Sequence, residues 1–338
     1  MDITPYLTLQ PAPRAVFARL STHADRPRFY LPSPGGWRPV TWGAFASMIR
    51  SAALWLSAEG FEPGERGVVF GGNSVAWGAA ALALQAAGGV MVPLYPASTV
   101  EQSAYVLSHS DARVVFVDGA AQLARLLECL PRCPDVQRVV LLDDRLDLDA
   151  ALASLSPDAR AALDDAWLRA SVVPWSRVME KGGALHARFA DRFDKLLDAI
   201  DLDAPTLMLY TSGTTGNPKG VPLTHRNVGV NGRDWLECLG SLIDEGAVDA
   251  LWLPFSHIFG FGELCLGNTL GFTSYMVDPA SVLARLPEIK PSVFMSVPAY
   301  WEKIAQAVAA EPDPAKRRAR LDVTGGRLTF SPLGRARG

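Results

Sequence analysis

The chain has 338 residues, of which 49% are hydrophobic and 20% are charged, so it is long enough for one large globular domain or two ordinary ones. This composition excludes a disordered chain and a collagen-like repeat. The 32 Lys and Arg residues nearly balance the 35 Asp and Glu residues, which leaves a formal net charge of −3. Such a balance gives no sign of a nucleic-acid-binding surface or an acidic tail, so any anionic ligand must be bound by a local group of residues.

Cysteine usage and the N-terminal residues indicate a cytoplasmic protein. The four cysteines, Cys129, Cys133, Cys238 and Cys265, are too few for a disulfide framework in a chain of this size. The first two lack a second ligand pair at zinc-ribbon spacing, so we interpret them as reduced thiols and expect no metal site. Residues 1–17 contain no basic stretch followed by an apolar core and a cleavage site of small residues, which argues against a secretory signal.

Helical stretches alternate with short apolar runs from Val40 to Asp118, and this alternation predicts crossover units around a parallel sheet that is buried on both faces. The expected helices are Trp42–Gly60, Ser74–Ala87 and Thr99–His109, and the expected strands are Gly67–Phe70, Val90–Leu94 and Arg113–Asp118. A helix at Leu123–Leu130 and a strand at Val136–Leu142 continue the pattern.

One part of this region, Val75–Leu94, is uncharged over a length that could span a membrane. It is rich in Ala and Gly and also contains Gln85 and Pro93, which do not suit a membrane span. We therefore predict a buried helix that leads into a buried strand.

The second half of the chain begins with an acidic stretch, Asp143–Asp165, which we interpret as a solvated amphipathic helical insertion; the alternative is an acidic binding site for a partner. After Asp201 a second alternating unit is expected, with a strand at Thr206–Tyr210 and apolar runs at Ala250–Leu253, Thr273–Val277 and Ser292–Val297. The predicted fold is therefore α/β, with two successive alternating α/β subdomains and mostly parallel sheets. The first subdomain is placed at residues 1–143, a helical, acidic insertion or linker at 144–200, and the start of the second subdomain at 201–338.

The most informative stretch is Tyr210–Gly220, where hydroxyl side chains, glycines and one lysine follow the expected strand directly. Glycines let backbone N–H groups approach an anion, hydroxyls add donors, and Lys219 supplies a positive charge, so the stretch predicts a phosphate-binding loop. It is not a Walker loop, because Pro218 stands where that pattern needs glycine, and it contains no Gly-x-Gly-x-x-Gly fingerprint. A surface loop without a ligand is the alternative.

This stretch closely resembles the phosphate-binding signature of the adenylate-forming superfamily, which includes acyl-CoA synthetases, luciferases and the adenylation domains of peptide synthetases. Three further segments reinforce the resemblance: Val221–Val228, Leu253–Gly260 and Pro291–Ile304. The last of them, together with Val75–Leu94 and Tyr95–Thr99, is most similar to the long-chain fatty acyl-CoA synthetase branch. The resemblance covers essentially Val40–Gly326.

The resemblance implies an ATP-dependent ligase that works in two steps. A fatty carboxylate attacks the α-phosphorus of ATP to give acyl-AMP and pyrophosphate, and the thiol of CoA, a cosubstrate, then attacks the acyl carbon. It further implies that the phosphates bind to the first loop, that Mg²⁺ binds to Thr211, and that His257 orients the substrate carboxylate, with His257 and Lys219 as the catalytic residues. The implied phosphate-binding residues are Thr211, Ser212, Gly213, Thr214, Thr215, Gly216 and Lys219.

Several other residues have two interpretations each. His225 is expected to pack at a helix start rather than to touch the substrate. The aromatic residues Trp252, Phe255, Phe259 and Phe261 either wall an acyl tunnel or belong to an ordinary core.

Motifs that relatives carry further along their chains are absent. These are an aromatic-Gly-x-Thr-Glu segment, a Thr-Gly-Asp segment, an arginine beyond it, and a mobile C-terminal domain with a catalytic lysine. The tail Thr329–Gly338 also departs from the family pattern. We therefore expect a C-terminally truncated or frame-disrupted product that makes negligible acyl-CoA when isolated.

Alternatives to a complete fatty acid:CoA ligase remain open. One is a non-catalytic fragment that binds nucleotide or acyl chains, or that works with a separate C-terminal half; another is an aryl or amino-acid adenylating relative. The expected partners are the small-molecule substrates, with no nucleic acid, and a peripheral membrane contact is left open.

Overall fold

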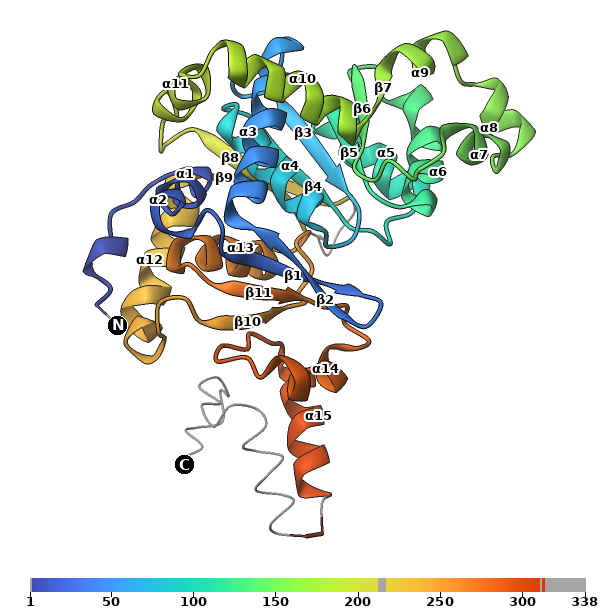
Figure 1. The fold of residues 1–338 in the computed structure, drawn as a ribbon. Helices are drawn as coiled ribbons and strands as arrows, with labels where there is room; N and C mark the ends of the chain where they lie inside the picture. The colour runs from blue at the N-terminus through green and yellow to red at the C-terminus, as the bar shows by residue number, and fades with distance from the viewer. Residues whose placement is uncertain (1, 212–216, 311, 314–338) are drawn as a thin grey trace.

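The computed structural model describes residues 2–211, 217–310 and 312–313, and Figure 1 shows two sheets, one above the other, with helices around and between them. The larger sheet has seven strands in the order β7 (Val172–Pro174), β6 (Arg138–Leu141), β5 (Ala112–Val117), β3 (Arg66–Phe70), β4 (Val90–Leu94), β8 (Pro205–Thr211) and β9 (Lys219–Thr224). The smaller sheet has the order β10 (Val248–Leu251), β11 (Thr273–Met276), β1 (Pro27–Ser33) and β2 (Gly36–Thr41).

Both sheets are mostly parallel, which confirms the predicted fold class. Among the described strands, the pairs β8–β9 and β1–β2 run antiparallel and the other pairs are parallel. The strands expected between residues 67 and 142 match β3 to β6 within a few residues. However, the two sheets do not follow one another along the chain as the predicted subdomains do.

The strand expected at Thr206–Tyr210 as the start of a second unit completes the larger sheet instead, since β8 pairs in parallel with β4 through Met91 and Leu207. The smaller sheet in turn takes β1 and β2 from the N-terminal region, where Phe29 lies opposite Ser274 of β11. Local patterns predict a strand but not its partner, because pairing depends on contacts far apart in the sequence. Each sheet thus takes strands from more than one of the predicted segments, and the boundaries at residues 143 and 200 remain predictions.

Helices cover both faces of the larger sheet. α3 (Trp42–Ala58) and α4 (Val75–Ala86) pack on one face with Val69 and Phe116, while α5 (Val100–His109) and α6 (Ala120–Cys129) pack on the other with Val68 and Val115. Successive strand residues point to opposite faces, so apolar runs fill two layers of core.

α4 and β4 confirm the predicted buried helix and buried strand. Every residue of α4 except Ala76 is buried, as is all of β4. None of the described helices combines the length and the apolar character that crossing a membrane requires. The expected cytoplasmic location remains a prediction.

The acidic stretch forms three short helices, α7 (Leu148–Ala153), α8 (Pro157–Ala161) and α9 (Asp165–Ser171). Each begins with a side-chain cap, supplied in turn by Asp147, Ser156 and Asp164, so part of the acidic and hydroxyl content serves helix starts. The strand β7 that follows was not anticipated. α10 (Trp175–Arg188) and α11 (Arg192–Asp198) then lead to β8.

The smaller sheet carries α13 (Ile258–Leu270) on the side that faces the larger sheet, with α12 (His225–Leu239) beside it, and α14 (Val282–Ile289) and α15 (Pro298–Ala309) on the far side (Figure 1). The N-terminal helices α1 (Ala12–Ala18) and α2 (Leu20–His23) lie beside α13 and α3. The apolar run expected as a strand at Ser292–Val297 is not one. It makes a single parallel bridge, between Val293 and Asp249, before α15 begins at Pro298.

Candidate functional site

The predicted phosphate loop lies at the end of the β8–β9 hairpin. Thr211 and Lys219 are directly paired across the two strands and both are exposed, so the structure brings these two predicted residues together. The other predicted phosphate-binding residues, Ser212 to Gly216, lie outside the described residues. Because β8 runs parallel to β4 and β3, the hairpin end lies at the carboxyl edge of the sheet, where ligands of open α/β sheets bind.

Tyr210 anchors the end of β8 next to Thr211. Its hydroxyl lies 2.8 Å from Nδ1 of His109, and its ring packs edge-on against Tyr105 at 6.3 Å between centroids. Burial raises the pKa of Tyr210 to about 12, so its hydroxyl stays protonated and hydrogen-bonded at neutral pH. Gly220, opposite Tyr210, leaves room for this ring, since a Cβ there would lie 3.2 Å from Tyr210 Cζ.

Asn73 joins the two sheets at their carboxyl edges, a role that the sequence analysis missed. It follows β3 in the larger sheet, and its side-chain Nδ2 donates to the carbonyl of Leu253, at 2.8 Å, just beyond β10. Its Oδ1 accepts from the backbone N–H of Phe255, also at 2.8 Å. Both contacts fall on the loop that carries His257. An Asn in the turn before a buried helix is the only signal the sequence offers for this contact.

His257 is the N-cap of α13 and is exposed. Its Nδ1 accepts from the backbone N–H of Phe259 at 3.2 Å, so in this geometry the ring proton lies on Nε2. The ring thus presents an N–H donor next to the first turn of α13, where the helix dipole also favours an anion. This arrangement suits contact with a carboxylate or phosphate oxygen.

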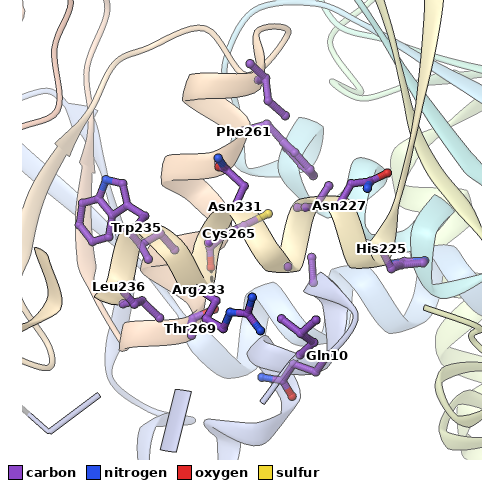
Figure 2. Close-up of a pocket in the computed structure, with 18 of the residues that line it drawn as sticks. Gln10, His225, Asn227, Asn231, Arg233, Trp235, Leu236, Phe261, Cys265 and Thr269 are labelled. Atoms are coloured by element: carbon purple, nitrogen blue, oxygen red, sulfur yellow. Dashed lines mark hydrogen bonds between the residues drawn. The ribbon is translucent and has the colours of Figure 1, made fainter. Parts of the chain in front are cut away.

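A pocket of about 520 Å³ opens between the N-terminal segment, α12 and α13 (Figure 2). Phe261, Cys265 and Thr269 line it from α13, and Gln10 lies on the N-terminal side. Ligand pockets are typically about 300–1,000 Å³ in volume and mostly apolar with a few polar groups. The pocket is therefore large enough for a small organic ligand.

Two of the four aromatic residues with two interpretations, Phe259 and Phe261, line the pocket. Phe261 is at the same time part of the core, with its ring centroid 6.3 Å from that of Trp77. Phe255 is core, with its ring centroid 5.5 Å from that of Trp77, and Trp252 packs on Tyr300 and donates from Nε1 to the carbonyl of Met295 at 2.9 Å. Periodicity alone does not separate the two pairs, since all four surround the same helix start.

Polar side chains also reach the pocket. Gln85 of α4, Thr206 of β8 and Glu263 of α13 line it although each is 1% exposed, and each has a side-chain oxygen without a hydrogen-bond partner. His225 packs at the start of α12 and is buried, as expected, yet it also borders the pocket. Burial lowers the pKa of His225 to about 4, so its ring is neutral at neutral pH.

The four cysteines are free thiols, two of them buried. Cys129 and Cys133 are buried beneath α5, and burial raises the pKa of Cys129 to about 12 and that of Cys133 to about 11. Within the described ranges, no three His, Cys, Asp or Glu side chains are grouped as metal ligands. Thr211 offers one exposed hydroxyl, which fits Mg²⁺ only as an ion held mainly by nucleotide phosphates.

Solved structures with a similar fold include the adenylation and carrier didomain of carboxylic acid reductase from Segniliparus rugosus in complex with AMP. It matches with a TM-score of 0.70 at 20% identity, over 94% of this chain and 48% of that one. A long-chain-fatty-acid–CoA ligase from Archaeoglobus fulgidus matches with a TM-score of 0.65 at 17% identity, over 90% of this chain and 55% of that one.

Similar sequences include the long-chain-fatty-acid–CoA ligase FadD15 of Mycobacterium bovis, which is 31% identical over 80% of this chain and 40% of its own length. The ligase ACSBG2 of Mus musculus is 26% identical over 80% of this chain and 39% of its own length. The chain thus spans about 40% of the length of these curated relatives. The family model of AMP-binding enzymes matches residues 16–334, and the chain therefore belongs to the family of AMP-binding, adenylate-forming enzymes.

Proposed function

We propose that this chain forms the nucleotide- and acyl-binding part of an AMP-forming long-chain fatty acid:CoA ligase. The observation that carries the proposal is the pairing of Thr211 with Lys219 at the carboxyl edge of the larger sheet. Asn73 attaches the loop of His257 to the same edge. The proposed phosphate loop and the N–H donor of His257 therefore lie at the same edge of the larger sheet.

Each residue has a role in this proposal. Lys219 and the loop from Thr211 to Gly216 bind the phosphates of ATP, and Nε2–H of His257 holds the attacking carboxylate oxygen near the α-phosphorus. The carboxylate oxygen forms a bond to phosphorus while the bond to the pyrophosphate oxygen breaks. Mg²⁺, bound through Thr211 and the phosphates, would neutralise charge on the polyanion.

The pocket supplies the acyl site. Phe259 and Phe261 begin its wall two and four residues after His257, so a carboxylate at His257 has an apolar path for its chain beside it. The pocket's similarity to a fatty acyl site rests on this adjacency and on the fatty acid–CoA ligases among the relatives. CoA remains part of the proposal through those relatives alone.

Pyrophosphate exchange into ATP that depends on palmitate tests the proposal. We expect Lys219→Met to weaken ATP binding about tenfold or more, which corresponds to one lost hydrogen bond to a charged group. Lys195→Met is the matched control, since Lys195 is an exposed lysine of α11 that pairs with Asp191. Equal ATP affinity of the two variants would contradict the assignment of the loop.

The exchange assay also separates the alternatives. Nucleotide binding without exchange, in the presence or absence of a downstream polypeptide from a homologous ligase, would favour a non-catalytic binding fragment. Exchange that appears only with the added polypeptide would favour a two-part enzyme. Exchange with benzoates or amino acids but not with palmitate would favour the aryl or amino-acid adenylating alternative.

A further inference from the structure

Residues that line the pocket carry hydrogen-bonding atoms that nothing in the described part of the chain satisfies. Oε1 of Gln85 and Oγ1 of Thr206 have no partner, although both residues line the pocket and are 1% exposed. The side chain of Gln85 lies against the backbone of Thr206, because Nε2 of Gln85 donates to the backbone carbonyl of Thr206 at 3.4 Å. That bond uses the amide nitrogen and leaves the amide oxygen as the unpaired atom.

Thr206 reaches this position through an irregularity in β8. Pro205 is paired with Thr224 and Leu207 with Leu223, so Thr206 is an extra residue in the ladder. An extra residue of this kind redirects a side chain and is common beside ligand sites. Leu223 of β9 and His225, the first residue of α12, line the pocket as well. The backbone N–H of His225 donates to the carbonyl of Ala204 at 3.3 Å, which places the start of α12 beside this part of β8.

The hydrogen-bonding groups of Gln85 and Thr206 favour some ligand groups over others. Gln85 Oε1 only accepts, whereas the hydroxyl of Thr206 donates and accepts. A ligand hydroxyl satisfies both groups, since its O–H donates to Gln85 and its oxygen accepts from Thr206. A ligand carboxylate would place its oxygens against the amide oxygen, and a methylene would leave both groups without partners.

We propose that the pocket binds a carboxylic acid whose carbon chain carries a hydroxyl group, and that Gln85 and Thr206 bind this hydroxyl. The inference rests on the proposed function in one respect, the use of the pocket as the acyl site. It adds a specificity that an entirely apolar tunnel does not have. The apolar lining around the pair, such as Phe261 and Leu223, holds the rest of the chain.

Calorimetric binding to the intact chain tests the inference without requiring catalysis. The probes are palmitate and a series of hydroxypalmitates that differ in the position of the hydroxyl. We expect one isomer to bind roughly tenfold more tightly than palmitate, because only that isomer pairs both polar groups. Thr206→Val and Gln85→Met should bring this ratio close to one while palmitate binds at least as well as before.

Ser103→Ala is the control variant. Ser103 of α5 is also buried with an unpaired hydroxyl, but it does not line the pocket, so its removal should leave the ratio unchanged. Equal binding of palmitate and every hydroxy isomer to the unmodified chain would overturn the inference alone, since water would then satisfy the pair. Binding of no acid at all would overturn the acyl pocket of the proposed function and the inference with it.

Discussion

At the scale of single residues, the least expected feature is a charged cluster inside the smaller sheet. Arg28 of β1 is fully buried and donates to Asn268 Oδ1 at 2.8 Å and to Ser274 Oγ at 2.5 Å. Asp249 of β10 and Glu263 of α13 are buried near it. Burial raises the pKa of Asp249 to about 6 and that of Glu263 well above its usual range. At neutral pH Arg28 is cationic and Asp249 is anionic, whereas burial favours the neutral form of Glu263.

These pKa shifts predict that two similar substitutions destabilise the chain to very different extents. Asp249→Asn leaves the buried Arg28 without its counter-charge and should lower the free energy of unfolding by about 3–5 kcal/mol at pH 7. Glu263→Gln removes an acid whose charged form is already disfavoured by burial, so it should cost far less. Thermal unfolding midpoints at pH 7, with the exposed Glu180→Gln as control, measure the difference. Equal destabilisation by the two substitutions would contradict the assigned charges.

The same cluster sets a direction for stability against pH. Because the folded chain holds the proton of Glu263 more tightly than the unfolded chain does, the free energy of unfolding falls as pH rises from about 4.5. Glu263→Gln should remove this part of the loss of stability. The free energy of unfolding of the variant should therefore rise, relative to that of the unmodified chain, between pH 5 and pH 8. Urea unfolding of both chains at both pH values checks this. If the difference in free energy of unfolding between the two chains is the same at pH 5 and pH 8, Glu263 is ionised in the folded chain.

At the scale of elements, local sequence patterns predicted where helices and strands lie better than they predicted which strands pair in a sheet. The Ala-rich Val75–Ala86 and the apolar Val90–Leu94 could be assigned from their periodicity. The three-residue β7 could not, because three residues carry no periodicity. In the candidate site, the sequence placed Thr211 and Lys219 in one loop but did not indicate Asn73, whose partners Leu253 and Phe255 are about 180 residues away.

Two adjacent glycines of α10 provide a test of how that helix packs. A Cβ at Gly182 would lie 1.9 Å from the carbonyl oxygen of Ser51 in α3, whereas a Cβ at Gly183 meets nothing within 4 Å. Gly182→Ala should therefore destabilise the chain by about 1–3 kcal/mol through overpacking. Gly183→Ala should stabilise it by about 0.5–1 kcal/mol, because Ala loses less backbone freedom in a helix. Chemical unfolding of both variants measures these changes, and the same sign for both would contradict the close α3–α10 contact.

The Asn73 contact predicts that the His257 loop depends on the larger sheet. Asn73→Ala removes both hydrogen bonds and should lower the free energy of unfolding by about 1–3 kcal/mol. It should also speed hydrogen exchange at the Phe255 amide. Asn73→Asp keeps an acceptor for that amide but loses the donor to Leu253. Exchange at Phe255 should therefore stay slow in Asn73→Asp, and fast exchange in both variants would show that the amide needs more than this acceptor.

At the scale of the whole molecule, the two sheets share the chain in an interleaved order. The smaller sheet combines β1 and β2 with β10 and β11, and the larger sheet closes with β8 and β9. Local sequence patterns cannot reveal this strand order. They indicate that a segment is a strand, but the strand with which it pairs is set by contacts far apart in the sequence. The match to adenylation domains at 20% identity or less rests on this shared arrangement.

Interleaving predicts that residues 1–200 do not fold when expressed alone. This fragment contains β1 and β2 without β11, and its β4 loses the pairing with β8, so buried edges of both sheets are exposed and should promote aggregation. Residues 1–224 restore β8 and β9 and serve as the control, which should be more soluble because the larger sheet is then complete as described. Size-exclusion chromatography and circular dichroism distinguish the two fragments. A monomeric, cooperatively unfolding fragment of residues 1–200 would contradict this expectation and would support the boundary predicted at residue 200.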